Sequence, residues 1–92
     1  MTNAGYKIIA QECYEAGNGR ELYIVLGHKV NTYGEDQYVT WGATLEGDAW
    51  SFYWGHYIED KGRAYKDYHE RLANEYERQI DENDRTLVLR EV

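Results

Sequence analysis

Two aromatic-rich segments joined by a very short turn constrain the fold of this chain more than any other feature. Residues 38–45 read YVTWGATL, residues 49–58 read AWSFYWGHYI, and the EGD between them is a hairpin signal. A connection this short cannot cross over a sheet, so the two segments must pair as antiparallel strands. The chain is therefore built around at least one β-hairpin.

The side chains of this hairpin separate into two kinds when Gly47-Asp48 is taken as a two-residue loop. One side is aliphatic and indole-rich, with Val39, Trp41, Ala43, Leu45, Trp50, Phe52, Trp54 and His56. The other carries tyrosine, threonine and glycine, with Tyr38, Thr40, Gly42, Thr44, Ser51, Tyr53, Gly55 and Tyr57. This segregation predicts a sheet with one covered face.

The same register makes specific pairs. It places Trp41 opposite Trp54 and Gly42 opposite Tyr53, whose ring would cover the glycine, and it sets Gly55 against Thr40. A two-residue loop at Glu46-Gly47 would shift the pairing but keep the faces, whereas a three-residue loop would exchange them.

Two earlier segments predict further antiparallel strands. Residues 6–14 and 21–30 are rich in Ile, Val and Tyr, and Asn18-Gly19 between them favours a type I′ turn. The polar connection 31–36 is too short for a parallel crossover. The first 58 residues therefore predict a four-stranded antiparallel meander.

The composition changes to helix-forming residues at Glu59. Residues 60–82 predict one helix with Asp60 as N-cap, and Asn83 and Asp84 would end it. Its apolar face consists of Tyr65, Tyr68, Leu72, Tyr76 and Ile80. We expect this face to cover the Trp41/Trp54 side of the sheet. Residues 86–90 would form either a short fifth strand or an extended tail, giving one α+β domain over residues 1–92.

The charge balance excludes several classes of function. Ten Lys and Arg stand against 17 Asp and Glu, a formal net charge of −7. This argues against general binding to nucleic-acid phosphates and against a polybasic membrane anchor.

No apolar run is long enough to span a membrane, and the polar start MTN is no signal peptide. A single Cys13 allows no internal disulfide. We expect a soluble cytoplasmic protein.

No residue pattern predicts catalysis, a metal or a cofactor. The three histidines, His28, His56 and His69, lack metal-site spacing, and no nucleophile elbow, P-loop or C-x-x-C is present. Three helical acids have a cation four residues later, in the pairs Glu59–Arg63, Asp67–Arg71 and Asp81–Arg85. Such pairs are typical of a solvated helix face rather than of acid–base catalysis. We therefore expect no enzyme.

Exposed tyrosines and uncompensated acids are the remaining candidates for function. Tyr38, Tyr53 and Tyr57 would share the face that the helix leaves open, and surface carboxylates can imitate phosphates at a cationic site. The candidate partner-binding residues are Asp36, Glu46, Asp48, Tyr53 and Tyr57, with Glu77, Asp81 and Glu82 as a second patch. The alternative is that the tyrosines only cover a sheet face that is partly exposed to solvent, and that the acidic residues only make the protein soluble.

Part of the chain resembles a recurring pattern. The segments YVTW at 38–41 and WGHY at 54–57, followed by Ala64, Asp67-Tyr68 and Arg71, are similar to small uncharacterised proteins encoded by phages and mobile elements of bacteria. That resemblance implies an accessory factor that blocks host defence, as anti-CRISPR and anti-restriction proteins do.

These observations lead to one expected function. We expect a protein-binding inhibitor of a host nucleic-acid enzyme such as a CRISPR effector, with no direct contact to nucleic acid. The alternatives are an immunity-type or other interaction module, and a small enzyme of unidentified type. The oligomeric state stays open, since an exposed edge at residues 6–14 would allow a dimer.

Overall fold

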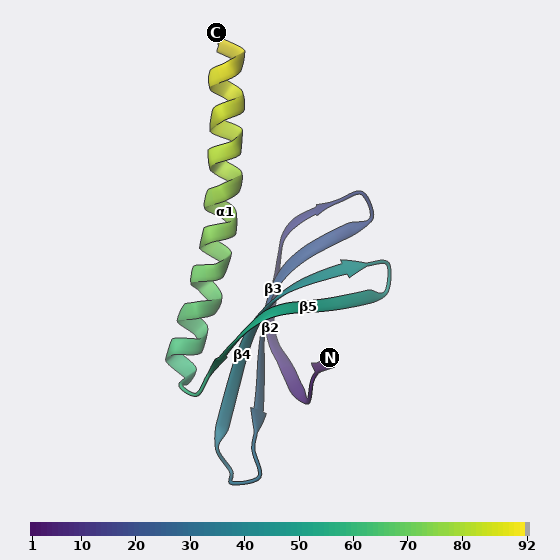
Figure 1. Ribbon diagram of the computed structural model, residues 1–92, viewed down its shortest axis with the longest axis vertical. Helices are drawn as coiled ribbons and strands as arrows, with labels where there is room; N and C mark the ends of the chain where they lie inside the picture. The colour runs from purple at the N-terminus through teal and green to yellow at the C-terminus, as the bar shows by residue number, and fades with distance from the viewer. Residues whose placement is uncertain (92) are drawn as a thin grey trace.

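One antiparallel sheet and one long helix make up the fold (Figure 1). The computed structural model describes the backbone of residues 1–91 and the side chains of residues 1–80. The sheet has five strands in sequence order, β1 Thr2–Asn3, β2 Tyr6–Gly17, β3 Arg20–Val30, β4 Asp36–Glu46 and β5 Ala49–Ile58. Helix α1 spans Lys61–Glu91. The predicted α+β meander with one C-terminal helix is confirmed.

The short additional strand exists, but at the other end of the chain from the predicted one. β1 pairs with the start of β2 through Thr2↔Lys7 and Asn3↔Tyr6, so it caps part of the edge that was expected to be exposed at residues 6–14. The prediction of a strand or extended tail at residues 86–90 is wrong, because these residues belong to α1.

The predicted end of the helix at Asn83 and Asp84 is also wrong, since α1 runs through both residues. Either residue costs only about 0.7 kcal/mol in a helix interior relative to alanine. Glycine and proline are the residues that end helices, and this chain has no proline and no glycine after Gly62.

The β4–β5 hairpin has the predicted register only over its first half. Leu45 pairs with Trp50 and Gly42 pairs with Tyr53, as expected for a Gly47-Asp48 loop. A β-bulge then interrupts the ladder, and Thr40 faces His56. The predicted pairs Trp41–Trp54 and Gly55–Thr40 are therefore wrong, because the extra residue shifts the register of β5.

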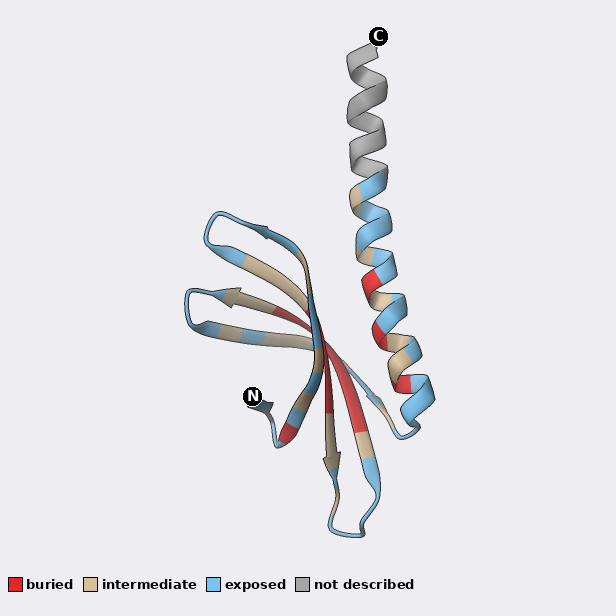
Figure 2. Cartoon of the chain, turned by 180° about the vertical axis from the view of Figure 1, so that it is seen from behind, coloured by how far each residue is buried: buried red, intermediate tan, exposed pale blue. Residues whose placement is uncertain are grey.

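The helix covers the opposite face of the sheet from the one predicted. Its apolar side packs into a core made by Ile24, Leu26, Tyr38, Ala64, Tyr68 and Leu72. The second core, on the other face, consists of Tyr6, Val25, Val39, Trp41 and Ala43. Figure 2 shows the buried residues gathered in the middle of the strands and in the first turns of α1.

Trp41 is buried without a helix above it because aromatic side chains of its own sheet cover it. Its ring lies 5.6 Å from Tyr6 and 5.4 Å from Phe52, both in edge-to-face arrangements. Only 5% of Trp41 remains exposed. Curling of the sheet thus closes this face on itself, and the helix packs on the Tyr38 side.

Asp60 caps the helix as predicted. The backbone N–H of Arg63 donates to Asp60 Oδ2 at 2.9 Å. The predicted apolar face of α1 is only partly used, since Tyr68 and Leu72 are buried but Ile80 is 56% exposed. None of the described helical residues forms a segment apolar enough to cross a membrane.

Candidate functional site

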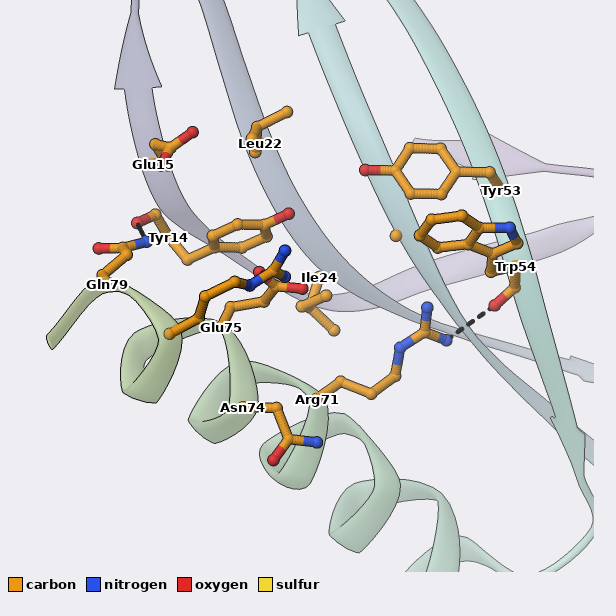
Figure 3. Close-up of a pocket in the computed structure, with 12 residues that line it drawn as sticks. Tyr14, Glu15, Leu22, Ile24, Tyr53, Trp54, Arg71, Asn74, Glu75 and Gln79 are labelled. Atoms are coloured by element: carbon orange, nitrogen blue, oxygen red, sulfur yellow. Dashed lines mark hydrogen bonds and ion pairs between the residues drawn. The ribbon is translucent and has the colours of Figure 1, made fainter. Parts of the chain in front are cut away.

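A cleft of about 470 Å³ lies between α1 and the sheet (Figure 3). Its floor is formed by Leu22, Ile24 and Gly42, and Tyr53 and Trp54 of β5 form one wall. The helix lines it with Arg71, Asn74, Glu75, Arg78 and Gln79, and β2 with Tyr14 and Glu15. A volume of this order is typical of small-ligand sites.

Trp54 stands at the mouth of this cleft in an unusual backbone conformation. Its φ is +52° in the β5 bulge, and 78% of the residue is exposed. A left-handed conformation at a non-glycine residue costs about 1 kcal/mol or more, and such strain gathers at functional sites. The expectation that Trp54 belongs to the core is therefore wrong.

Tyr53 lies on Gly42, as the hairpin register predicted. A Cβ at Gly42 would collide with the Tyr53 ring, whose Cζ would stand 3.0 Å away. Tyr53 faces the helix side and lines the cleft, while Tyr38 is buried against α1. Since Tyr57 lies beyond the bulge and pairs with Val39, the prediction that these three tyrosines share an open face is wrong.

Arg71 joins the helix to two strands. Its Nη1 donates to the carbonyl oxygen of Trp54 at 2.8 Å, to that of Thr40 at 3.0 Å and to Thr40 Oγ1 at 3.1 Å. Burial lowers the pKa of the Arg71 guanidinium from its ordinary value, although nearby Asp67 opposes the shift. The side chain is a half-buried cation bonded to neutral oxygens.

Asp67 forms a second polar junction beside it. Its Oδ2 accepts from Thr40 Oγ1 at 2.5 Å and lies 2.9 Å from His56 Nδ1. Burial acts to raise the pKa of Asp67, but the hydrogen bonds from Thr40 and His56 outweigh it and lower that pKa. The carboxylate orients the imidazole of His56 as in an acid–base pair.

Within residues 1–80, the side chain of His56 forms a hydrogen bond with Asp67 and with no other side chain. Thr40 is fully buried, and its hydroxyl donates to Asp67 rather than to the imidazole. The same contacts correct the prediction of an exposed Asp67–Arg71 ion pair, since both side chains turn to the sheet. Within residues 61–80 of the helix, the ion pairs formed are instead Lys66–Glu70 and Arg78–Glu75.

The predicted partner-binding acids are spread over the molecule. Asp36 begins β4, and its Oδ1 lies 2.7 Å from His28 Nε2. Glu46 and Asp48 are exposed at the β4–β5 turn. Glu46 lies 4.0 Å from Arg20. Glu77 is exposed on α1. Asp81 and Glu82 are helical, but their side chains lie outside the described residues.

Three acids from two separate segments line one hollow, and we call them the acidic patch: Glu35, Asp36 and Glu59. Together with Asn31 and Gln37 they line a hollow of about 370 Å³. Asn31 shapes the loop, since its Oδ1 accepts from the backbone N–H of Glu35 at 2.9 Å. No Lys or Arg lines this hollow.

Sequence reasoning missed Arg71 and Trp54 as site residues. A signal for Arg71 was available, because it follows Ala64 and Tyr68 at helical spacings of seven and three and precedes Leu72 directly. No signal marked Trp54, since an indole in an alternating strand reads as core. Among residues 1–80 no three His, Cys, Asp or Glu side chains gather as a metal site would need.

The chain matches no protein-family model, no curated protein and no solved structure. Two regions stand out by packing and charge, the cleft beside Arg71 and the acidic patch.

Proposed function

We propose that this chain is a non-enzymatic, protein-binding inhibitor of a nucleic-acid enzyme, and that the acidic patch docks on a cationic site of that enzyme. The observation that carries the proposal is that Glu35, Asp36 and Glu59 line one hollow that no Lys or Arg lines. A concave group of carboxylates presents acceptor oxygens much as a phosphate backbone does, and it attracts basic side chains over several ångströms.

The surrounding charge favours the same partner. Residues 31–60 contain no Lys or Arg, so strands β4 and β5 have no cation of their own. Glu46 and Asp48 are exposed at the far end of this hairpin, and Glu77 is exposed on α1, away from the acidic patch in the sequence. An acidic surface of this kind raises association rates with a basic partner.

Two exposed tyrosines lie close to the acidic patch in the sequence. Tyr33 lies in the β3–β4 loop between Asn31 and Glu35 and is 85% exposed, and Tyr57, two residues before Glu59, is 72% exposed. Tyrosine offers apolar area and a hydroxyl at a low entropy cost, which suits the centre of a protein interface. These two residues would supply the apolar contacts of the docked complex.

The choice of partner class also draws on the resemblance of residues 38–71 to small phage and mobile-element proteins. An inhibitor of a host defence enzyme such as a CRISPR effector acts in the cytoplasm, and its partner is the protein rather than the nucleic acid. The His56–Asp67 pair would then serve the packing of α1 on the sheet.

Capture from a bacterial lysate, followed by a salt titration, tests this proposal. Wild-type chain on a resin should retain a nucleic-acid enzyme, and raising the salt from about 0.1 M to about 0.5 M should release it. The variant E35K/E59K should lower the affinity at least about tenfold. E70K is the matched control, because Glu70 is an exposed acid on α1 outside the patch. Unchanged binding by E35K/E59K would remove the patch from the interface.

A second candidate is an interaction module that does not imitate nucleic acid. The exposed Trp54 and Tyr57 on β5 favour it, because solitary large aromatics on a sheet edge are common in protein interfaces. Binding that survives high salt and E35K/E59K but is lost in Y57A would support this candidate over the first.

A further inference from the structure

The guanidinium of Arg71 has free hydrogen-bonding capacity directed at the cleft. All three of its hydrogen bonds within the described residues come from Nη1. Among the described residues, Arg71 forms no ion pair with a carboxylate within 4.0 Å. Figure 3 shows its guanidinium turned toward Tyr53 and Trp54. The edge formed by Nε and Nη2 is the fork that binds a carboxylate through two parallel hydrogen bonds.

The charge of the cleft limits the kind of anion. Arg71 and Arg78 line it together with Glu15 and Glu75, and Glu75 is paired with Arg78. A dianion such as a phosphate monoester would be repelled by the two glutamates, whereas a singly charged carboxylate needs only the one guanidinium. Arg71 is therefore the anchoring cation.

The wall beside Arg71 is aromatic and held under strain. Tyr53 and Trp54 lie edge to face with ring centroids 5.0 Å apart. The positive φ of Trp54 keeps its indole at the mouth of the cleft, and the bond from Arg71 to its carbonyl fixes that conformation. A flat ring placed here would contact the indole on one side and the apolar floor of Leu22 and Ile24 below.

We propose that this cleft binds an aromatic carboxylate, with the ring against Trp54 and Tyr53 and the carboxylate on Arg71. The group would belong either to a free aromatic acid or to the C-terminus of a peptide that ends in an aromatic residue. This site is separate from the acidic patch, so it goes beyond the function proposed above.

Two probes distinguish the two sources. Phenylacetate represents the free acid, and the peptide Gly-Gly-Phe with a free carboxylate represents a chain end. In NMR titrations of the full chain, we expect the indole N–H signal of Trp54 and the backbone amide of Tyr53 to shift and saturate at millimolar probe. Phenylacetamide and the Gly-Gly-Phe amide have the same rings without the charge, and they should bind at least about tenfold more weakly.

Trp54→Gly is the decisive variant, because glycine adopts a positive φ without strain and the carbonyl that binds Arg71 is kept. W54G should fold and should weaken both carboxylate probes at least about tenfold, read from Tyr53. R71K keeps the charge but loses the fork, and it should weaken them too. Ile9→Ala is the control, since Ile9 is an exposed apolar residue that does not line the cleft.

The outcomes separate cleanly. Binding of both probes supports a site for an aromatic carboxylate of either source. Binding of only one probe also supports the proposal and shows whether the carboxylate belongs to a free acid or to a peptide C-terminus. Absence of saturable shifts at Trp54 and Tyr53, equal binding of acids and amides, or full binding by W54G would overturn it. W54G leaves Glu35, Asp36 and Glu59 unchanged, so loss of probe binding with intact partner capture separates this site from the proposed function.

Discussion

Arg71 donates from Nη1 to the backbone carbonyl of Trp54 at 2.8 Å, and this bond fastens the middle of α1 to the β5 bulge. The same nitrogen bonds both the carbonyl and the hydroxyl oxygen of Thr40 on β4. One helix side chain therefore holds two strands at the point where the ladder between them is interrupted. A hydrophobic contact could not do this, because the groups that the bulge frees are polar.

Replacing Arg71 with methionine should destabilise the protein. R71M keeps most of the side-chain volume but leaves the carbonyls of Trp54 and Thr40 without their donor. Hydrogen bonds to a charged group contribute about 1.5–3 kcal/mol, and partial exposure of Arg71 places the expected loss near about 1–2 kcal/mol in urea unfolding. Lys66→Met, on an exposed position of the same helix, should change the free energy of unfolding by less than about 0.5 kcal/mol. Equal effects of the two variants would contradict the role of Arg71.

Asp67 should make stability depend on pH in the acid range. Its pKa in the folded protein lies below the ordinary value of 3.8, so its ionised form stabilises the fold at every pH above that value. This contribution is lost as the pH falls through the lowered pKa, because protonation removes the charge that Thr40 and His56 hold.

The variant D67N isolates that effect. D67N should be less stable than wild type at about pH 7, and the difference should be smaller at about pH 2.5, because the protonated fraction of Asp67 rises as the pH falls below its ordinary pKa of 3.8. Urea unfolding at both pH values measures the two differences. D48N, at an exposed residue of the β4–β5 turn, should show no such change. A difference for D67N that stays constant with pH would mean that the Asp67 charge does not stabilise the fold.

The positive φ of Trp54 predicts that glycine is better tolerated there than alanine. W54A removes the indole but leaves the backbone strain in place, whereas W54G removes the indole and relieves the strain. W54G should therefore be more stable than W54A by about 1 kcal/mol in urea unfolding. At Tyr57, which has an ordinary strand conformation, the order should reverse, with glycine about 0.5–1 kcal/mol less stable than alanine. The same order at both positions would argue against strain at Trp54.

Local signals in the sequence were sufficient for the four long strands, their order and the start of the helix, but not for β1 or for the end of the helix. Short connections such as Gly47-Asp48 force neighbouring strands to be antiparallel, and Asp60 marks the start of the helix through a bond that the structure contains. These features depend on a few adjacent residues, so no tertiary information was needed to predict them.

The covered face and the site depended on tertiary packing. Strict alternation placed Trp54 in the core, but one bulge reversed the faces of the residues after it. Both faces of the sheet are apolar enough to attract a helix, and the curl that lets Tyr6 and Phe52 cover Trp41 decided between them. The spacing of Asp67 and Arg71 alone predicts an exposed ion pair. Both side chains turn to the sheet because each forms a hydrogen bond with Thr40, which the sequence does not reveal.

Gly42 should tolerate no side chain, because the Tyr53 ring occupies the space where its Cβ would stand. G42A must displace that ring from the wall of the cleft, and overpacking of this kind costs about 1–3 kcal/mol in urea unfolding. Gly17→Ala is the control, since no atom lies within 4 Å of a Cβ there.

A double-mutant cycle identifies Tyr53 as the cause. In a Y53A background the ring is gone, so G42A should cost at least about 1 kcal/mol less than it does in wild type. If the cost of G42A is the same with and without Tyr53, the constraint on Gly42 comes from the backbone and not from the ring. A smaller loss of stability from G42A in the Y53A background would show that the contact between Gly42 and Tyr53, which the hairpin register predicts, holds Tyr53 in place. Tyr53 forms the wall of the cleft next to Trp54.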